Sequence, residues 1–397
     1  MNDDSEISNQ DFLTALALAL HRAGASAPRL EDRVAEAAAT LGIEATCFAT
    51  PTSIFVSVGE HVRLLRVEPQ GAHLERLVLV DQVAVEVGAG RMSAAAGRRE
   101  LERIERAPPR YRTAVRVLCV ALVSAAATVF FGGIPTEIAA SAVLGLGVGL
   151  WGELARRGAG ARVNELVAAL GVAAGVTLLA RITPVSIPIL TLSGVIVLLP
   201  GLTLTVALSE MASGHLASGT ARFAGAMVTF LQLGVGTALG WKLSDLLPRA
   251  AMAPRVELPP WVLWAALLAA GIAYVVLLYA RPRDSWVVIG MAFFSFEAAR
   301  IGSDWLGPQL GACAAALLVG LAANLYARLR NLPATLAQLP GLLILVPGSL
   351  GFQGFRAMLL SDRDAGIDAA FTMVLVAGSL VAGLLTAQVI LPARKVL

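Results

Sequence analysis

Residues Leu198–Gly201 read LLPG, and residues Leu345–Gly348 read LVPG, 147 positions further along the chain. Each Pro-Gly pair follows a glycine in an apolar run, Gly194 or Gly341. Proline and glycine interrupt helices, and unwound backbone persists inside a bilayer only where it lines a cavity. Matched interruptions in two halves of a chain are typical of transporters and point to a central binding site. Transport is therefore the leading hypothesis.

The composition is that of a membrane protein. The chain is 57% hydrophobic and 15% charged, whereas soluble domains average roughly 45–50% apolar and about 25% charged residues. Acidic residues outnumber arginines in residues 1–112, so the basic excess belongs to the hydrophobic part that follows. The two lysines, Lys242 and Lys395, form no basic patch, which argues against a nucleic-acid partner.

The sequence contains no pattern typical of an enzyme or a cofactor site. Cys47, Cys119 and Cys313 lie too far apart for a metal-ligand motif or a disulfide framework. The glycines at 145, 147 and 149 lie inside an apolar run and follow no strand, unlike those of a dinucleotide site. The histidines lie in no hydrolase motif. We expect no enzymatic activity, no cofactor and no metal.

A small α+β domain is predicted over residues 1–109, ending near Pro108 and Pro109. We expect helices at 11–23, 28–41 and 93–106, because apolar positions recur there at helical spacing. Short β-branched runs predict strands at 44–49, 53–58 and 62–67, whereas 78–87 fits either a strand or a helix. The first twelve residues are acidic and polar, unlike a signal peptide. This domain is therefore expected in the cytoplasm.

The remainder is predicted to be an α-helical polytopic membrane protein with about ten transmembrane helices. Spans of about twenty apolar residues divide into a first repeat of five in 110–245 and a second of five in 246–397. Five spans per repeat place the two repeats in inverted orientation. The positive-inside rule puts both termini in the cytoplasm. The ten predicted spans are 114–132, 136–154, 163–181, 187–208, 221–241, 260–280, 285–302, 308–327, 333–354 and 368–391.

The interrupted segments carry the candidate substrate-binding residues. Breaking a helix frees backbone groups that polar side chains or a bound solute must satisfy. The alternative is a kink that serves only packing, in which nearby Ser and Thr hydroxyl groups satisfy the freed backbone groups. The candidates are Pro200, Gly201, Thr203 and Thr205 at the first break, and Pro347, Gly348, Ser349 and Gln353 at the second.

Three acidic residues are candidates for proton coupling, because charges in or near spans are costly and usually face a cavity. Glu210 follows the first break, within reach of His215 and Arg222 if the loop folds back. Glu153 lies near Arg156, so pairing at the membrane interface competes with a role in coupling. Glu297 precedes Arg300 by three residues on one predicted helix, so the two could instead neutralise each other locally.

The chain resembles the bacterial threonine/serine exporter family in its fused, single-chain form. The matching parts are Pro51-Thr52, Ser93–Ile104, Leu198–Arg222 and Val346–Gly351. The resemblance implies proton-motive export of L-threonine or L-serine, for which the hydroxyls of Thr203, Thr205 and Ser349 are suited. Export of small dicarboxylates is the alternative, and a scaffold or channel without coupled transport is a further one. The expected partners are an amino-acid substrate, protons and the lipid bilayer, and homo-oligomerisation is left open.

Overall fold

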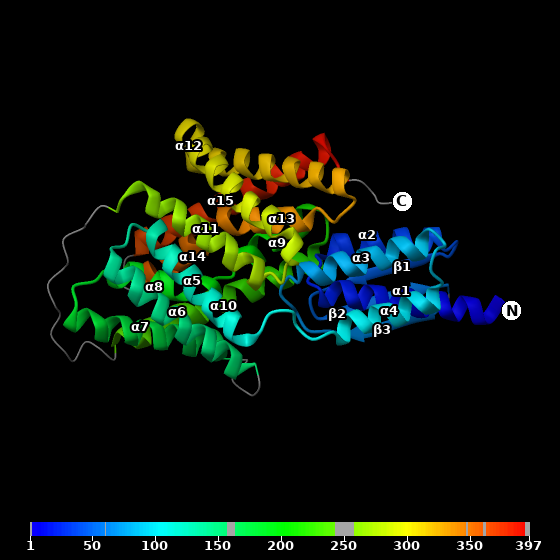
Figure 1. Cartoon of the computed structure of the whole chain (residues 1–397), viewed down its shortest axis with the longest axis horizontal. Helices are drawn as coiled ribbons and strands as arrows, with labels where there is room; N and C mark the ends of the chain where they lie inside the picture. Colours follow the sequence, from blue (N-terminus) through cyan, green and yellow to red (C-terminus); the bar gives the residue numbers. More distant parts are fainter. Residues whose placement is uncertain are drawn as a thin grey trace.

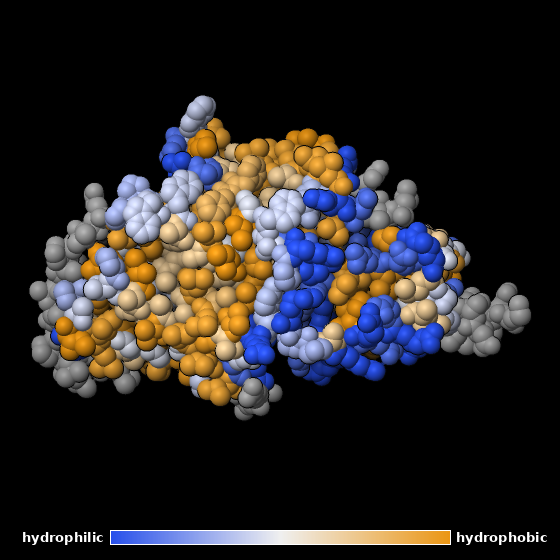
Figure 2. All heavy atoms as spheres, viewed as in Figure 1, coloured by the Kyte–Doolittle hydropathy of each residue, from blue (hydrophilic) through white to orange (hydrophobic). Residues whose placement is uncertain are grey.

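The computed structural model describes residues 2–59, 61–156, 163–242, 258–346, 348–359 and 363–393. Figure 1 shows an N-terminal domain at one end of the molecule and a larger body of helices at the other. The space-filling view separates the same two parts by hydropathy. Apolar residues cover the helical body, and hydrophilic residues gather over the N-terminal domain and its junction with the body (Figure 2).

The N-terminal domain packs four helices around a small sheet. Strands β1, β2 and β3 form an antiparallel sheet in the order β1-β2-β3, within one residue of the predicted runs. Alternate residues of β2, Ile54, Val56 and Val58, are buried, as expected for a strand with one covered face. The ambiguous segment at 78–87 is helical. The elements are α1 Asn2–Arg22, α2 Ala27–Thr40, β1 Ala45–Ala49, β2 Ser53–Val58, β3 His61–Arg66, α3 Leu74–Gly88 and α4 Ala94–Arg106.

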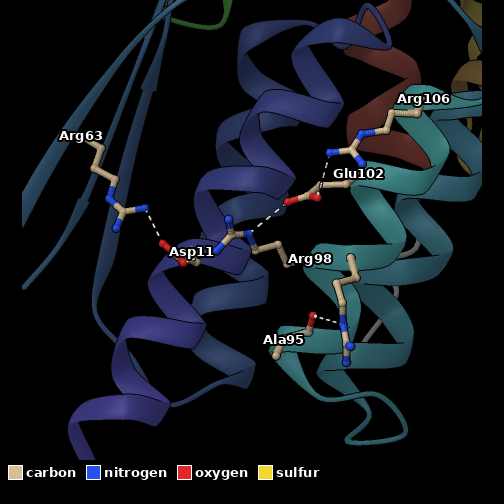
Figure 3. A network of polar contacts seen from close by, with 7 residues as sticks. Asp11, Arg63, Ala95, Arg98, Glu102 and Arg106 are labelled. Atoms are coloured by element: carbon tan, nitrogen blue, oxygen red, sulfur yellow. Dashed lines mark hydrogen bonds and ion pairs between the residues drawn. The ribbon is translucent and has the colours of Figure 1, made fainter.

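Ion pairs join α1, β3 and α4 on the surface of this domain (Figure 3). Asp11 on α1 accepts from Arg63 on β3 at 2.6 Å and also pairs with Arg98 on α4. Glu102 pairs with Arg98 and with Arg106 along α4. These groups are partly exposed, so each pair adds little stability.

The hydrophobic body consists of helices long and apolar enough to cross a membrane. Among the described residues eight helices meet this criterion, or nine if α8 and α9, bent by 55° at a short break, count as one span. The chain is thus a polytopic membrane protein, and the count of ten stays a prediction. The elements are α5 Thr113–Phe130, α6 Pro135–Ala155, α7 Asn164–Ile182, α8 Ile187–Val195, α9 Gly201–Ala212, α10 Leu216–Lys242, α11 Pro260–Leu277, α12 Ser285–Arg330, α13 Thr335–Leu345, α14 Gly348–Leu359 and α15 Arg363–Ile390.

Helix α12 doubles back on itself at Gly307. This glycine has φ +78° and ψ 170°, and proline follows it. A Cβ atom added to Gly302 would lie 2.9 Å from the carbonyl oxygen of Gly311. Nine residues of straight helix would separate these positions by about 13 Å. The predicted spans 285–302 and 308–327 are therefore the two arms of a helical hairpin.

The helices repeat along the chain with the same offset as the Pro-Gly pairs. Helix α11 begins and ends 147 residues after α5 begins and ends. Helix α14 follows α9 with the same offset at both ends. Contacts repeat as well. A Cβ on Gly194 would meet Val172, and one on Gly341 would meet Val319, the residue equivalent to Val172. Gly236 similarly packs against the carbonyl of Leu166, as Gly383 does against that of Cys313.

Equivalent helices α5 and α11 lie side by side and run in opposite directions. Cys119 and Val123 of α5 cluster with Ala273 and Val276 of α11. Further along α5, Ala126 clusters with Ala266 and Ala270, which come earlier in α11. A rise in residue number along one helix thus matches a fall along the other. Two copies of one unit related by inversion would have this arrangement.

Candidate functional site

The first break lies between α8 and α9. After Val195 the helix tightens into a 3₁₀ turn at Ile196–Leu198, Leu199 is extended, and α9 begins at Gly201 behind Pro200. At the second break α13 ends at Leu345, Val346 is extended, and α14 begins at Gly348. Pro347 lies outside the described residues. Both breaks therefore interrupt apolar helices at equivalent positions.

The two breaks are in direct contact. A Cβ atom placed on Gly201 would lie 3.0 Å from both the Cα and the amide nitrogen of Gly348, and would overlap Val346. A Cβ on Gly348 would in turn lie 3.2 Å from Cβ of Leu199. Side chains larger than hydrogen are tightly excluded at these distances. Equivalent segments of the two repeats thus meet at one place, called here the break junction (residues 199–201, 346 and 348).

The polar side chains near the break junction differ in their surroundings. Thr205 is 1% exposed, and its hydroxyl donates to the carbonyl of Gly201 at 3.2 Å. This bond satisfies a group within the helix and fits the interpretation of a healed kink. Thr203 and Gln353 are exposed and Ser349 is half-buried. The hydroxyl and amide groups of these three residues are thus accessible near the junction.

Helix α8, which leads into the first break, carries two buried hydroxyl groups. Thr191 and Ser193 are each 0% exposed, and their oxygens have no hydrogen-bond partner among the described residues. Leaving a hydroxyl group unpaired in an apolar interior costs about 1–3 kcal/mol. Two buried hydroxyl groups that have no hydrogen-bond partner among the described residues thus precede the first break. The sequence patterns single out neither residue.

Glu210 forms a buried polar cluster with Arg222 and the N-terminal domain. It is 1% exposed at the end of α9. The Arg222 guanidinium donates from Nε to both carboxylate oxygens, at 3.1 and 3.0 Å. Ser218 donates to Oε2 at 2.7 Å, and the amide of Ala27 at the start of α2 donates to Oε1 at 2.9 Å. A charge-assisted bond at a helix N-terminus is favourable.

The ring of His215, which was expected near Glu210, instead contacts the N-terminal domain. Its Nε2 lies 3.2 Å from Oε2 of Glu31, whose other oxygen accepts the amide of Ala49 at 2.8 Å. Earlier on α2, Arg29 donates to Oε1 of Gln338 on α13 at 2.5 Å. Burial lowers the pKa of Arg29. The start of α2 therefore touches both halves of the helical body.

The other two coupling candidates are neutralised by arginines. Glu153 accepts from Arg116 at 2.9 Å with both oxygens and also pairs with Arg156. Glu297 pairs with Arg300 at 2.6 Å. Both sets of contacts match the alternative of local pairing that the sequence left open. Such pairing requires no movement of protons.

Helix α3 anchors the N-terminal domain to the turn between α11 and α12. The amides of Leu74 and Glu75 donate to the carbonyls of Leu278 and Tyr279 at 2.9 and 3.1 Å. The rings of His73 and Tyr279 stack with centroids 4.4 Å apart. Burial, with the charge of Arg76 second, lowers the pKa of His73 to about 4. The ring is therefore neutral at pH 7.

Glu137 and Asp284 are buried carboxylates at equivalent helix starts of the two repeats. Glu137 accepts the backbone amides of Ile134, at 2.9 Å, and Ser186. Asp284, its counterpart in the second repeat, accepts from Nε of Arg281 at 2.6 Å. The terminal nitrogens of Arg281 are buried with no hydrogen-bond partner in the part of the chain that the structure describes. The repeat offset is the signal that would have paired these two acids.

Two family models match the chain. A family model described as a threonine/serine exporter matches residues 11–244, and a second, described as Threonine/Serine exporter, ThrE, matches residues 261–390. No curated protein and no solved structure matches the chain. The first model alone covers more than half of the sequence and the second covers most of the rest. The chain therefore belongs to the threonine/serine exporter family.

Proposed function

We propose that this protein is a secondary active exporter of small hydroxylated amino acids, L-threonine and L-serine, that works by alternating access. The contact between Gly201 and Gly348 is the observation that carries the proposal. A solute bound beside it would touch both repeats at once, so that movement of one repeat against the other changes the side from which the solute is reached. The family assignment supports amino-acid export.

The proposal assumes ten spans arranged as two inverted repeats. The hairpin of α12 supplies two membrane crossings from one long helix, and each broken pair of short helices supplies one. The antiparallel contact of α5 with α11 supports inversion. The end of the body that touches the N-terminal domain is placed in the cytoplasm, as are both termini. The membrane is the inner membrane of a bacterium.

Thr203, Ser349 and Gln353 are proposed to contact the substrate. Their accessible polar groups suit a zwitterion that carries a hydroxyl group. Thr205 is assigned the structural task of holding the backbone of α9, because its hydroxyl is bonded to Gly201. Pro200 and Pro347 keep the backbone interrupted, while Gly201 and Gly348 allow the two breaks to approach.

Glu210 is the proposed proton-coupling residue, because it is buried and lies on α9, the helix that follows the first break. Glu210→Gln should remove the dependence of transport on a pH difference, while exchange of substrate across the membrane stays measurable. Glu210→Ala is the matched test of structure, since it also removes the acceptor for Ala27. Loss of both activities in Glu210→Gln, or of neither, would reject this assignment.

The decisive experiment is counterflow in liposomes against a panel of amino acids and small dicarboxylates, with and without an imposed pH difference. Threonine and serine should exchange fastest. Faster exchange of a dicarboxylate would show that the substrates are dicarboxylates. Exchange that does not change with the imposed pH difference would contradict proton coupling. Gly201→Val should lower exchange at least tenfold by forcing the breaks apart. Gly225→Val is the control, because a Cβ there meets nothing within 4 Å.

A further inference from the structure

The start of helix α2 in the N-terminal domain contacts two helices, α9 and α13, that move against each other in the proposed carrier. Ala27 binds Glu210, at the end of the helix that follows the first break, and Arg29 binds Gln338, on the helix that precedes the second. Glu31 adds His215, just after α9. Residues 27–31 are called here the α2 clamp. They join helices of different repeats, which alternating access requires to move against one another.

The contact of Ala27 with Glu210 is buried and charge-assisted, and those of Arg29 with Gln338 and of Glu31 with His215 are partly buried. Glu210 is 1% exposed, and the amide of Ala27 approaches it in the protein interior. When the start of α2 withdraws, Glu210 loses one donor but keeps Arg222 and Ser218, so release leaves no lone charge in the interior. Ala27, Arg29 and Glu31 lie close together at the start of one helix, so their three contacts should form and break together. A contact with two discrete states is the kind of element that can act as a gate.

The positions equivalent to the clamp receptors Glu210 and Gln338 carry other residues in the opposite repeat. Glu210 is matched in the second repeat by Ala357, and Gln338 is matched in the first by Thr191. Neither replacement offers a carboxylate or an amide to a docking helix. The clamp is thus a feature of one side only, although the helices that it grips are duplicated.

We propose that the α2 clamp is the cytoplasmic gate of the exporter, and that it must release α9 and α13 in every transport cycle. The inference rests on the proposed function and extends it to the N-terminal domain. The domain then takes part in each turnover instead of serving as a passive anchor. Arg29, Glu31, Glu210 and Gln338 are positioning residues in this scheme, because they set the state of the gate without contacting solute.

The test is a reversible cross-link across the clamp. Arg29→Cys and Gln338→Cys are combined with replacement of Cys47, Cys119 and Cys313 by alanine, and the full chain is reconstituted in liposomes. A short bis-methanethiosulfonate reagent should reduce threonine exchange at least tenfold, and dithiothreitol should restore it. Exchange within twofold of the untreated protein would overturn the proposal.

The control pair is Asp11→Cys with Arg63→Cys, which replaces a contact of similar length inside the N-terminal domain (Figure 3). The same reagent should leave threonine exchange by this control variant unchanged. Equal loss in both pairs would overturn the gate, because restraint of the domain itself would then explain the effect. Failure of the proposed function looks different, since the unmodified chain would move no amino acid at all.

A second measurement avoids the double substitution. Gln338→Cys alone, in the same cysteine-free background, is labelled from the cytoplasmic side with a membrane-impermeant maleimide. Release of the clamp during turnover should raise the labelling rate at least threefold when saturating threonine is present on both sides. An unchanged rate would show that α13 stays covered, and would overturn the proposal.

Discussion

The two repeats share their backbone packing but differ at two equivalent helix starts, called here the corners. They contain Glu137 in the first repeat and Asp284 in the second. In the first repeat the buried Glu137 is satisfied by two backbone amides, one of them from Ser186. In the second, Pro333 occupies the position equivalent to Ser186 and has no amide to donate, while Arg281 replaces Ile134. Asp284 therefore bonds to a guanidinium. A carboxylate stands at both corners, but different groups hold it.

The difference follows the position of the N-terminal domain. The Arg281 corner lies beside the turn at Leu278 and Tyr279 that α3 binds, whereas no described element of the N-terminal domain contacts α6 or α8 strongly. The two corners thus differ in whether the N-terminal domain lies beside them. Small residues at helix contacts have stayed equivalent, because both repeats need the same close approach.

The sharpest test of the comparison removes charge at each corner in turn. Asp284→Asn should cost about 3–5 kcal/mol, because it leaves the buried Arg281 without its counter-charge. Glu137→Gln should cost less, about 1–3 kcal/mol, because one amide donor loses its acceptor. Reversible unfolding in detergent micelles measures both. A larger loss in Glu137→Gln would mean that the two corners are not held as described.

The corner of the first repeat can also be converted into that of the second. Ser186→Pro removes a donor to Glu137 and should cost about 1–3 kcal/mol. Adding Ile134→Arg places a guanidinium where Arg281 stands in the second repeat, and should recover part of the loss. The same unfolding measurement applies. If Ser186→Pro is neutral, the amide of Ser186 is not what satisfies Glu137.

A third test concerns what the repeats share. Gly236→Ala and Gly383→Ala each direct a Cβ at a backbone carbonyl of the neighbouring helix. Overpacking of this kind costs about 1–3 kcal/mol, and the two losses should be alike. Gly147→Ala is the control, since a Cβ there has open space. Clearly unequal losses would indicate that the helix contacts have diverged along with the corners.

The smallest expected effect is a dependence on pH at the contact of His73 with the second repeat. The folded pKa of His73 is about 4, below the value of about 6.5 in an unfolded chain. The unfolded state therefore binds a proton first, and stability falls as pH drops from 6.5 towards 4. His73→Phe, which retains a ring beside Tyr279, should flatten this dependence in thermal unfolding scans. It should not abolish it, because burial and the charge of Arg222 lower the pKa of His21 as well. An unchanged slope would contradict the assignment.

Sequence patterns predicted the features that arise from nearby residues. Apolar runs located the helices, β-branched runs located the strands, and the spacing of Glu297 and Arg300 left open the pair that forms. The offset of the two Pro-Gly pairs placed Gly201 and Gly348 at equivalent breaks. Segment 78–87 was ambiguous because a short apolar run fits either period, and packing against α4 and α1 decides for a helix.

What the sequence did not predict depends on contacts between distant segments. Ala27 meets Glu210 across 183 residues, and Arg29 meets Gln338 across 309. No local periodicity records such pairs. His215 was placed with Glu210 because both are close in sequence, but Glu31 from the N-terminal domain competes for its ring. The clamp therefore became visible only once the domain was placed on the helical body.

The hydrophobic cluster of the N-terminal domain also contains Leu336 and Leu339 of α13. These residues are synthesised about 230 positions after α4 ends. At translation rates of roughly 5–20 residues per second, the interval is on the order of 10–50 s. During that time Leu336 and Leu339 do not yet cover the apolar surface that they bury in the finished protein. The apolar cluster of the N-terminal domain is therefore completed only after α13 has been made.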